Sequence, residues 1–200
     1  MSPPRRQPRW SRLSRLTLAL AIAHLLPVVA WAAFKPVRVL APELLGLHCA
    51  PSGVCVDDVA RLAEAERLRD EALAFVGQRV GTIAQPPRTI FCSTLACSQS
   101  FGFTRDAAYN VGTFGQVISH RGWQPHFVRH ELIHHLQNER LGTWNAWLLK
   151  PSWLIEGMAY ALSEDPRQPL PQPLQGWRTS FAQWRAATRG QDLWLAAQAF

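Results

Sequence analysis

The feature that most constrains this chain is the motif His130-Glu-Leu-Ile-His134. Histidines four residues apart lie one above the other only on a helix, where both imidazoles can reach a single ion. Glu131 lies about 100° around such a helix from His130, so its carboxylate can meet a water molecule without binding the ion. A zinc hydrolase needs two neutral nitrogen ligands, an open position for water and a carboxylate that takes the proton of that water. The motif therefore predicts both a helix and a metal site.

The residues around the motif predict a largely buried helix. Gly122 and Pro125 mark a turn into it, and Gly142 ends it after about Leu141. Its apolar positions fall on one stripe, which consists of Val128, Leu132 and Leu136 with Ile133 beside them. Polar side chains on such a helix are costly unless they are paired or coordinate something. This favours the metal site over the alternative, a satisfied polar cluster on a helix surface.

A third ligand is required, and Glu156 is the strongest downstream candidate. It lies in an apolar segment for which we expect a helix from Trp153 to about Ser163, capped by Ser152. A carboxylate in such surroundings needs a partner, so it is either a metal ligand or one half of a buried salt bridge. The neighbouring Gly157 permits close approach of the two motif-bearing helices.

Together, His130-Glu-x-x-His134 and Trp153-Leu-x-Glu156-Gly-x-Ala159 resemble the gluzincin metallopeptidases, specifically the small peptidase MA-like domains. The resemblance covers roughly residues 115–163. It implies a zincin-like fold, one zinc ion per chain held by His130, His134 and Glu156, and Glu131 as the general base of peptide-bond hydrolysis. The sequence departs from the family pattern in two respects. Twenty-one residues separate His134 from Glu156, slightly more than in the best-known members, and Tyr160 stands where some relatives have an acidic residue that orients a ligand histidine.

A further group that stabilises the transition state is usual in this family. The residues that qualify by position are His120, Tyr109, His135 and Tyr160. His135 directly follows a ligand, so a contact with a neighbouring residue is its more common role. His120 ends a predicted strand, Gly115–His120, and in zincins such an edge strand lines the cleft and can pair with an extended substrate.

The N-terminus has the pattern of an export signal. Five arginines with no acidic residue among them precede an apolar run from Leu16 to Phe34, and Ala30-Trp-Ala32 supplies the small residues that signal peptidase recognises. Cleavage after Ala32 is the favoured interpretation, and an uncleaved membrane anchor is the alternative. We thus expect residues 1–32 to be a signal peptide or anchor. In both cases residues 33–200 lie in the periplasm or on the extracytoplasmic face of the membrane.

The charge of the chain does not indicate a nucleic-acid partner. The formal net charge is +7, but without the five N-terminal arginines the chain has 16 basic and 14 acidic residues. We therefore expect a peptide or protein substrate and no nucleic acid. The five arginines are Arg5, Arg6, Arg9, Arg12 and Arg15.

All four cysteines follow the apolar run, in agreement with export. The close pairs suggest the disulfides Cys49–Cys55 and Cys92–Cys97, although four cysteines allow three pairings. A structural zinc site is the alternative, but neither spacing is that of a zinc knuckle.

The remaining sequence predicts a single α+β domain over residues 33–200, with a small sheet packed on the motif helix. Residues 35–56 and 164–176 are expected to be irregular, and a helix is expected from Asp57 or Asp58 to Gly77 or Gly81. Strands are expected at Arg88–Cys92 and Gly115–His120, and the stretch between them is expected to be a loop with some extended structure. A last helix begins near Trp177 and is interrupted at Gly190.

Two features leave the function open to alternatives. Trp144, Trp147 and Trp153 flank the proposed site, where a core or membrane-facing role is favoured over lining a substrate cleft. A catalytically inactive zinc-binding interaction module in the cell envelope is the main alternative to a peptidase. A tryptophan-rich envelope-binding protein with a structural metal would need a fourth ligand, such as His135 or His126.

Overall fold

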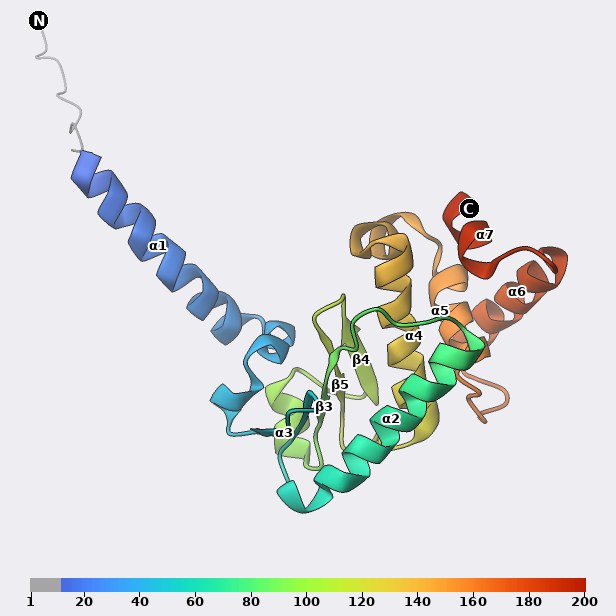
Figure 1. Ribbon diagram of the computed structural model, residues 1–200, viewed down its shortest axis with the longest axis horizontal. Helices are drawn as coiled ribbons and strands as arrows, with labels where there is room; N and C mark the ends of the chain where they lie inside the picture. The colour runs from blue at the N-terminus through green and yellow to red at the C-terminus, as the bar shows by residue number, and fades with distance from the viewer. Residues whose placement is uncertain (1–11) are drawn as a thin grey trace, which may run out of the picture. The chain divides into compact units, whose positions relative to one another are not determined.

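A computed structural model describes residues 12–200 (Figure 1). The chain divides into two compact units, one up to Arg38 and one from Val39 to Phe200. The first contains helix α1 (Arg12–Ala33), and its segment Leu16–Ala33 has a mean hydropathy of 2.0, long and apolar enough to cross a membrane. This helix is compatible with a signal sequence or an anchor. Arg5, Arg6 and Arg9 of the predicted basic stretch lie outside the described residues.

The second unit contains a five-stranded mixed sheet with the order β1-β2-β3-β5-β4. The inner strands β2, β3 and β5 are parallel, and each edge strand pairs antiparallel with its neighbour. Two predictions were wrong here. Residues 35–56 hold two strands, and the strand that begins at Gly115 is an inner strand, because a missed strand forms the edge beyond it. The strands are β1 (His48–Cys49), β2 (Val54–Val56), β3 (Arg88–Phe91), β4 (Ala108–Val111) and β5 (Gly115–Ile118).

The residues from Val39 onward also contain six helices, and several short helical turns lie between the elements of the chain (Figure 1). The helices are α2 (Leu62–Arg79), α3 (Leu95–Ser100), α4 (Pro125–Leu141), α5 (Ser152–Leu162), α6 (Leu174–Ala187) and α7 (Leu193–Ala199). The turns are η1 (Lys35–Leu40), η2 (Pro42–Leu45), η3 (Val59–Arg61) and η4 (Asn145–Leu149). The mixed α+β class is therefore confirmed.

Alternation along the strands gives the sheet two apolar faces. Val56, Phe91 and Ile118 belong to the larger cluster, which the helices α2, α4, α5, α6 and α7 complete. Cys55, Ile90 and Val117 point to the opposite face and a smaller cluster. Both clusters consist only of residues from Val39 onward, so the second unit contains its whole core.

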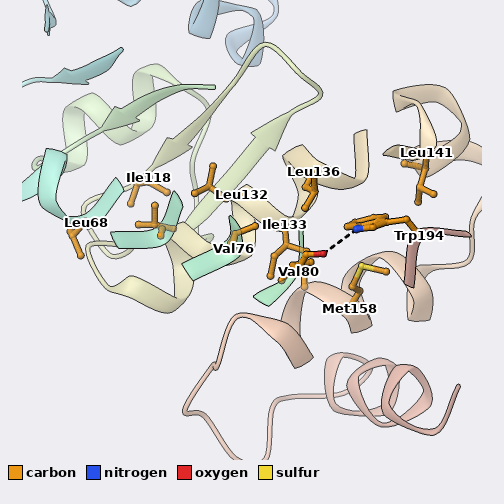
Figure 2. Close-up of a cluster of buried hydrophobic side chains, with 14 of the residues drawn as sticks. Leu68, Val76, Val80, Ile118, Leu132, Ile133, Leu136, Leu141, Met158 and Trp194 are labelled. Carbon is orange, nitrogen blue, oxygen red and sulfur yellow. Dashed lines mark hydrogen bonds between the residues drawn. The ribbon is translucent and has the colours of Figure 1, made fainter. Parts of the chain in front are cut away.

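Figure 2 shows the centre of the larger cluster, where α2, α4 and α7 meet. The predicted stripe of α4 is confirmed, since Val128, Leu132, Ile133 and Leu136 are completely buried. Trp194 of α7 packs beside Leu136 and donates a 3.0 Å hydrogen bond from Nε1 to the carbonyl oxygen of Val80, just after α2 (Figure 2). This hydrogen bond therefore connects α7 to the end of α2, the first α-helix of this unit.

The ends of α5 differ in detail from the prediction. Ser152 is the first residue of the helix and not its cap, because Pro151 occupies that position. Gly157 does permit a close approach, but the neighbour is α6 and not α4. A Cβ atom at Gly157 would lie 2.3 Å from the carbonyl oxygen of Trp177. The predicted loop before α6 is also shorter than expected, because this helix begins at Leu174.

The cysteines form the two predicted disulfides. Cys49–Cys55 joins the paired strands β1 and β2, and Cys92–Cys97 joins the end of β3 to α3. No cysteine is free, so the structural-zinc alternative for these residues is wrong. Two disulfides are compatible with an oxidising compartment, where such bonds persist.

Candidate metal centre

His130, His134 and Glu156 converge on one point, as predicted. The two histidine Nε2 atoms are 3.0 Å apart, and each lies 3.6 Å from one carboxylate oxygen of Glu156. The ligand atoms of all three residues lie within 4.8 Å of one another. Two nitrogens and a carboxylate oxygen that face the same small volume can hold one metal ion.

The local structure explains how residues so far apart in sequence meet. The sequence from Pro125 to Leu141 forms a straight α4 because its apolar stripe is buried in the core and Gly142 ends it. The segment from residue 142 to 151 then reverses the chain, and η4 takes up most of the extra length that separates the two motifs. Packing of α5 beside α4 brings Glu156 opposite the two histidines.

The charges of the cluster favour a bound cation. Burial lowers the pKa of His130 to about 4, so this imidazole is neutral at pH 7 and its nitrogen lone pair is available. Burial raises the pKa of the Glu156 carboxyl, but hydrogen bonds from the two histidines and the positive charge of His134 outweigh this and hold it far below the usual range. Burial disfavours a charged His134, yet the contact with Glu156 raises its pKa to about 9. His130 and Glu156 therefore have the protonation states of metal ligands, and a metal ion would displace the proton of His134.

Glu131 is placed beside this cluster and not within it. Its side chain is 5% exposed and lines the same cavity as the three converging residues. Burial raises the pKa of its carboxyl to about 8. A carboxylate with a pKa near neutrality is suited to accept and return a proton.

Comparisons with protein-family models, with curated proteins and with solved structures found no match.

Gln137 is a site residue that the sequence did not reveal. Its Oε1 atom lies 2.8 Å from His134 Nδ1, and its Nε2 donates a 2.9 Å hydrogen bond to the carbonyl oxygen of Ile155. It is 1% exposed and lies one turn after His134 on the same helix face. The signal for this role in the sequence was an amide side chain three residues after the candidate ligand His134, on a helix expected to be buried. Gln137 thus fixes the ring of His134 and ties it to the helix that carries Glu156.

Tyr160, the residue at the departure from the family pattern, contacts the other histidine. Its ring meets that of His130 edge-on, with the centroids 4.5 Å apart. Burial raises the pKa of Tyr160 to about 12, so its hydroxyl keeps its proton at neutral pH. Among the four residues considered for transition-state stabilisation, Tyr160 both lines the cavity and touches a candidate ligand.

The other three residues lie elsewhere or are otherwise occupied. Tyr109 lines the cavity, but its hydroxyl donates to the carbonyl oxygen of Phe101 at 2.8 Å. His120 lies 3.0 Å from Ser98 Oγ, and His135 is buried with its Nε2 2.9 Å from the carbonyl oxygen of Gln85. Neither His120 nor His135 is among the residues that line the cavity, and neither His135 nor His126 joins the metal-ligand cluster found within residues 12–200.

The cavity has a volume of about 780 Å³ and extends along the sheet edge. Ala108, Tyr109 and Asn110 of the edge strand β4 line it opposite α4 and α5. Asn138 of α4 fixes this strand, because its Nδ2 donates to Asn110 Oδ1 at 3.0 Å and lies 3.3 Å from the carbonyl oxygen of Gly112. The cluster therefore opens into a cavity that the edge strand β4 borders.

Proposed function

We propose that this protein is an exported zinc-dependent peptidase with a zincin-like fold, of the gluzincin type represented by the peptidase MA-like domains. The observation that carries the proposal is the convergence of His130, His134 and Glu156 beside Glu131 in one cleft. Two histidines and a glutamate are a catalytic ligand set, since three protein ligands leave a position open.

The distances between ligand atoms support zinc as the metal. Atoms bound tetrahedrally to one zinc ion at about 2.0–2.1 Å lie about 3.3 Å from one another. Here the two histidine nitrogens are 3.0 Å apart, and each lies 3.6 Å from a different carboxylate oxygen of Glu156, which is close to that spacing. The negative charge of Glu156 offsets part of the charge of a divalent ion, and Gln137 supplies the hydrogen bond that fixes a ligand imidazole. The residues present therefore fit the ion.

The roles of the residues follow from their positions. Zinc, when bound, polarises a scissile carbonyl and lowers the pKa of a coordinated water towards about 7. The carboxylate of Glu131 accepts the proton of the attacking water and returns it to the leaving amine. Tyr160, which lines the same cavity and keeps its proton at neutral pH, is the proposed hydrogen-bond donor to the oxygen on which negative charge develops.

The edge strand β4 supports both the proposed zincin-like fold and a peptide as the substrate. An exposed strand edge can add an extended peptide by backbone hydrogen bonds, and β4 is such an edge along the cleft. A peptide or an unfolded protein segment is therefore the expected substrate.

Helix α1 and the disulfides support a location outside the cytoplasm. A cleaved signal would release the domain into the periplasm, and an uncleaved α1 would hold it on the extracytoplasmic face of the membrane.

The test is zinc content per chain, combined with hydrolysis of a mixed peptide library, for wild type, Glu156→Ala and Glu131→Gln. We expect about one zinc in wild type, clearly less in Glu156→Ala, and full zinc but no hydrolysis in Glu131→Gln. A folded wild type without zinc would refute the proposal. Wild type that holds zinc but cleaves no peptide would instead support the inactive interaction module.

A further inference from the structure

A cluster of exposed apolar side chains lies at the end of α4, at the mouth of the cleft. Trp144 is 75% exposed, Trp147 57%, Leu148 70% and Leu149 74%. Phe114, in the turn between β4 and β5, is 64% exposed. A Cβ atom at Gly112 would lie 3.3 Å from Thr143 Cγ2 and 3.9 Å from Phe114 Cδ2, so the turn and the segment after α4 are neighbours. We call these five residues, Phe114, Trp144, Trp147, Leu148 and Leu149, the apolar rim.

The rim is not explained by the core or by the cleft. None of its five residues belongs to either buried cluster. Of the five, Trp147 lines the cavity, and the other four are not among its lining residues. Large side chains concentrated in this way on a surface indicate an interaction site.

The charges beside the rim indicate the kind of partner. From residue 140 to 155 the chain has two basic residues, Arg140 and Lys150, and no acidic residue. Lys150 directly follows the rim, and its Nζ donates to the carbonyl oxygen of Gln198. Tryptophan and leucine next to lysine are typical of segments that enter the interface of a bilayer, where the ammonium group meets lipid phosphates.

Helix α1 is an independent observation in favour of a membrane as the partner. It is an apolar segment of bilayer length in the same chain, and its leucine and valine side chains are exposed. As an anchor it would hold the domain at the membrane, and as a signal it would deliver the domain across one.

We propose that the apolar rim inserts into the headgroup region of a membrane that contains anionic phospholipid, and that the ammonium group of Lys150 binds the lipid phosphates. The proposal does not depend on zinc or on peptide hydrolysis. Because Trp147 and Lys150 also line the cavity, the docked domain opens its cleft at the lipid surface.

The experiment is co-sedimentation of residues 33–200, which contain the complete core, with vesicles of phosphatidylcholine plus phosphatidylglycerol. The test variant carries Trp144→Ser, Leu148→Ser and Leu149→Ser. These residues are exposed, so the variant should fold, which circular dichroism and thermal unfolding would verify. The matched control carries Leu44→Ser, Val59→Ser and Leu95→Ser, at residues that are also exposed but lie outside the rim.

We expect wild type and the control variant to bind these vesicles, and the rim variant to lose at least about tenfold in partition coefficient. Lys150→Gln should weaken binding to the mixed vesicles and leave binding to pure phosphatidylcholine unchanged. Equal binding by the rim variant and wild type, or no binding by wild type, would overturn the proposal. Analytical ultracentrifugation without lipid tests a second outcome. If wild type forms a dimer that the rim substitutions abolish, the rim joins two copies of the chain and the proposal is overturned.

Discussion

The side chain of Gln137 donates a 2.9 Å hydrogen bond to the backbone carbonyl of Ile155, the residue that precedes Glu156. The Oε1 atom of the same side chain accepts a hydrogen bond from Nδ1 of His134. One amide thus links two candidate ligands that lie on different helices. The position of Glu156 relative to His134 depends on this link, because Ile155 and Glu156 share a peptide bond.

The link predicts that Gln137 sets zinc affinity. Gln137→Met fills the same space without hydrogen bonds, and we expect it to weaken zinc binding about 10- to 100-fold. Gln137→Glu keeps an acceptor for His134 and should retain more affinity than the Met variant. Competition with a chromogenic chelator measures both. Affinity within twofold of wild type in a folded Met variant would show that Gln137 does not orient the site.

Removal of the metal should lower the stability of the protein. A ligand that binds only the folded state stabilises it by about 2.7 kcal/mol at a concentration 100 times its Kd. We expect a lower Tm in a chelator than in excess zinc, by scanning calorimetry with the disulfides intact. In Glu156→Ala the difference between the two conditions should be much smaller. An equally large difference in this variant would place the stabilising zinc at another site.

The close approach of α5 and α6 predicts opposite effects for two glycines in helices. Gly157→Ala would put a Cβ atom 2.3 Å from the carbonyl oxygen of Trp177, whereas a Cβ atom at Gly77 in α2 meets nothing within 4 Å. We expect Gly157→Ala to lower the free energy of unfolding by about 1–3 kcal/mol. Gly77→Ala should raise it by about 0.5–1 kcal/mol, since alanine favours a helix. Urea unfolding measures both, and a neutral Gly157→Ala would mean that the helices separate without cost.

Asp57 is expected to make part of the stability depend on pH. Burial raises the pKa of its carboxyl, but hydrogen bonds from the backbone and side chains of Ser93 and Thr94 outweigh this and hold the pKa below the usual value. The folded pKa is depressed, so this stabilisation is present above the unfolded pKa of about 3.9 and is lost as the pH falls through the folded pKa.

Asp57→Asn should therefore be less stable than wild type at pH 7, and the difference should shrink below about pH 4. Urea unfolding at a series of pH values checks this expectation. Asp70→Asn, at an exposed carboxylate on α2, controls for the change of net charge. A difference between wild type and Asp57→Asn that stayed constant down to pH 2 would contradict the assignment.

The site was more predictable from sequence than the sheet, for a physical reason. The motif, the apolar stripe and the flanking Pro125 and Gly142 act within one helix, so local chemistry determines α4, whose ends match the prediction. The two disulfides were predictable in the same way, because each pair is close in sequence.

The sheet depends on contacts between distant segments. Strands β1, β2 and β4 have only two to four residues, too few to show alternation, and pairing with neighbours stabilises them. Because β4 is too short to recognise, the sequence predicts that β5 is the edge strand and that His120 lies in the cleft. Gln137 was missed because its partner, the carbonyl of Ile155, lies on another helix.

The hydrogen bond between Trp194 and Val80 spans 114 positions of the chain. Helix α4 lies within that span and packs against α2 before it and α5 and α7 after it. In a chain that emerges from its N-terminus, His130 and His134 come before Glu156. All three come before α7, the helix that completes the core. Glu156 therefore completes the set of candidate ligands late along the chain, and α7 completes the core later still.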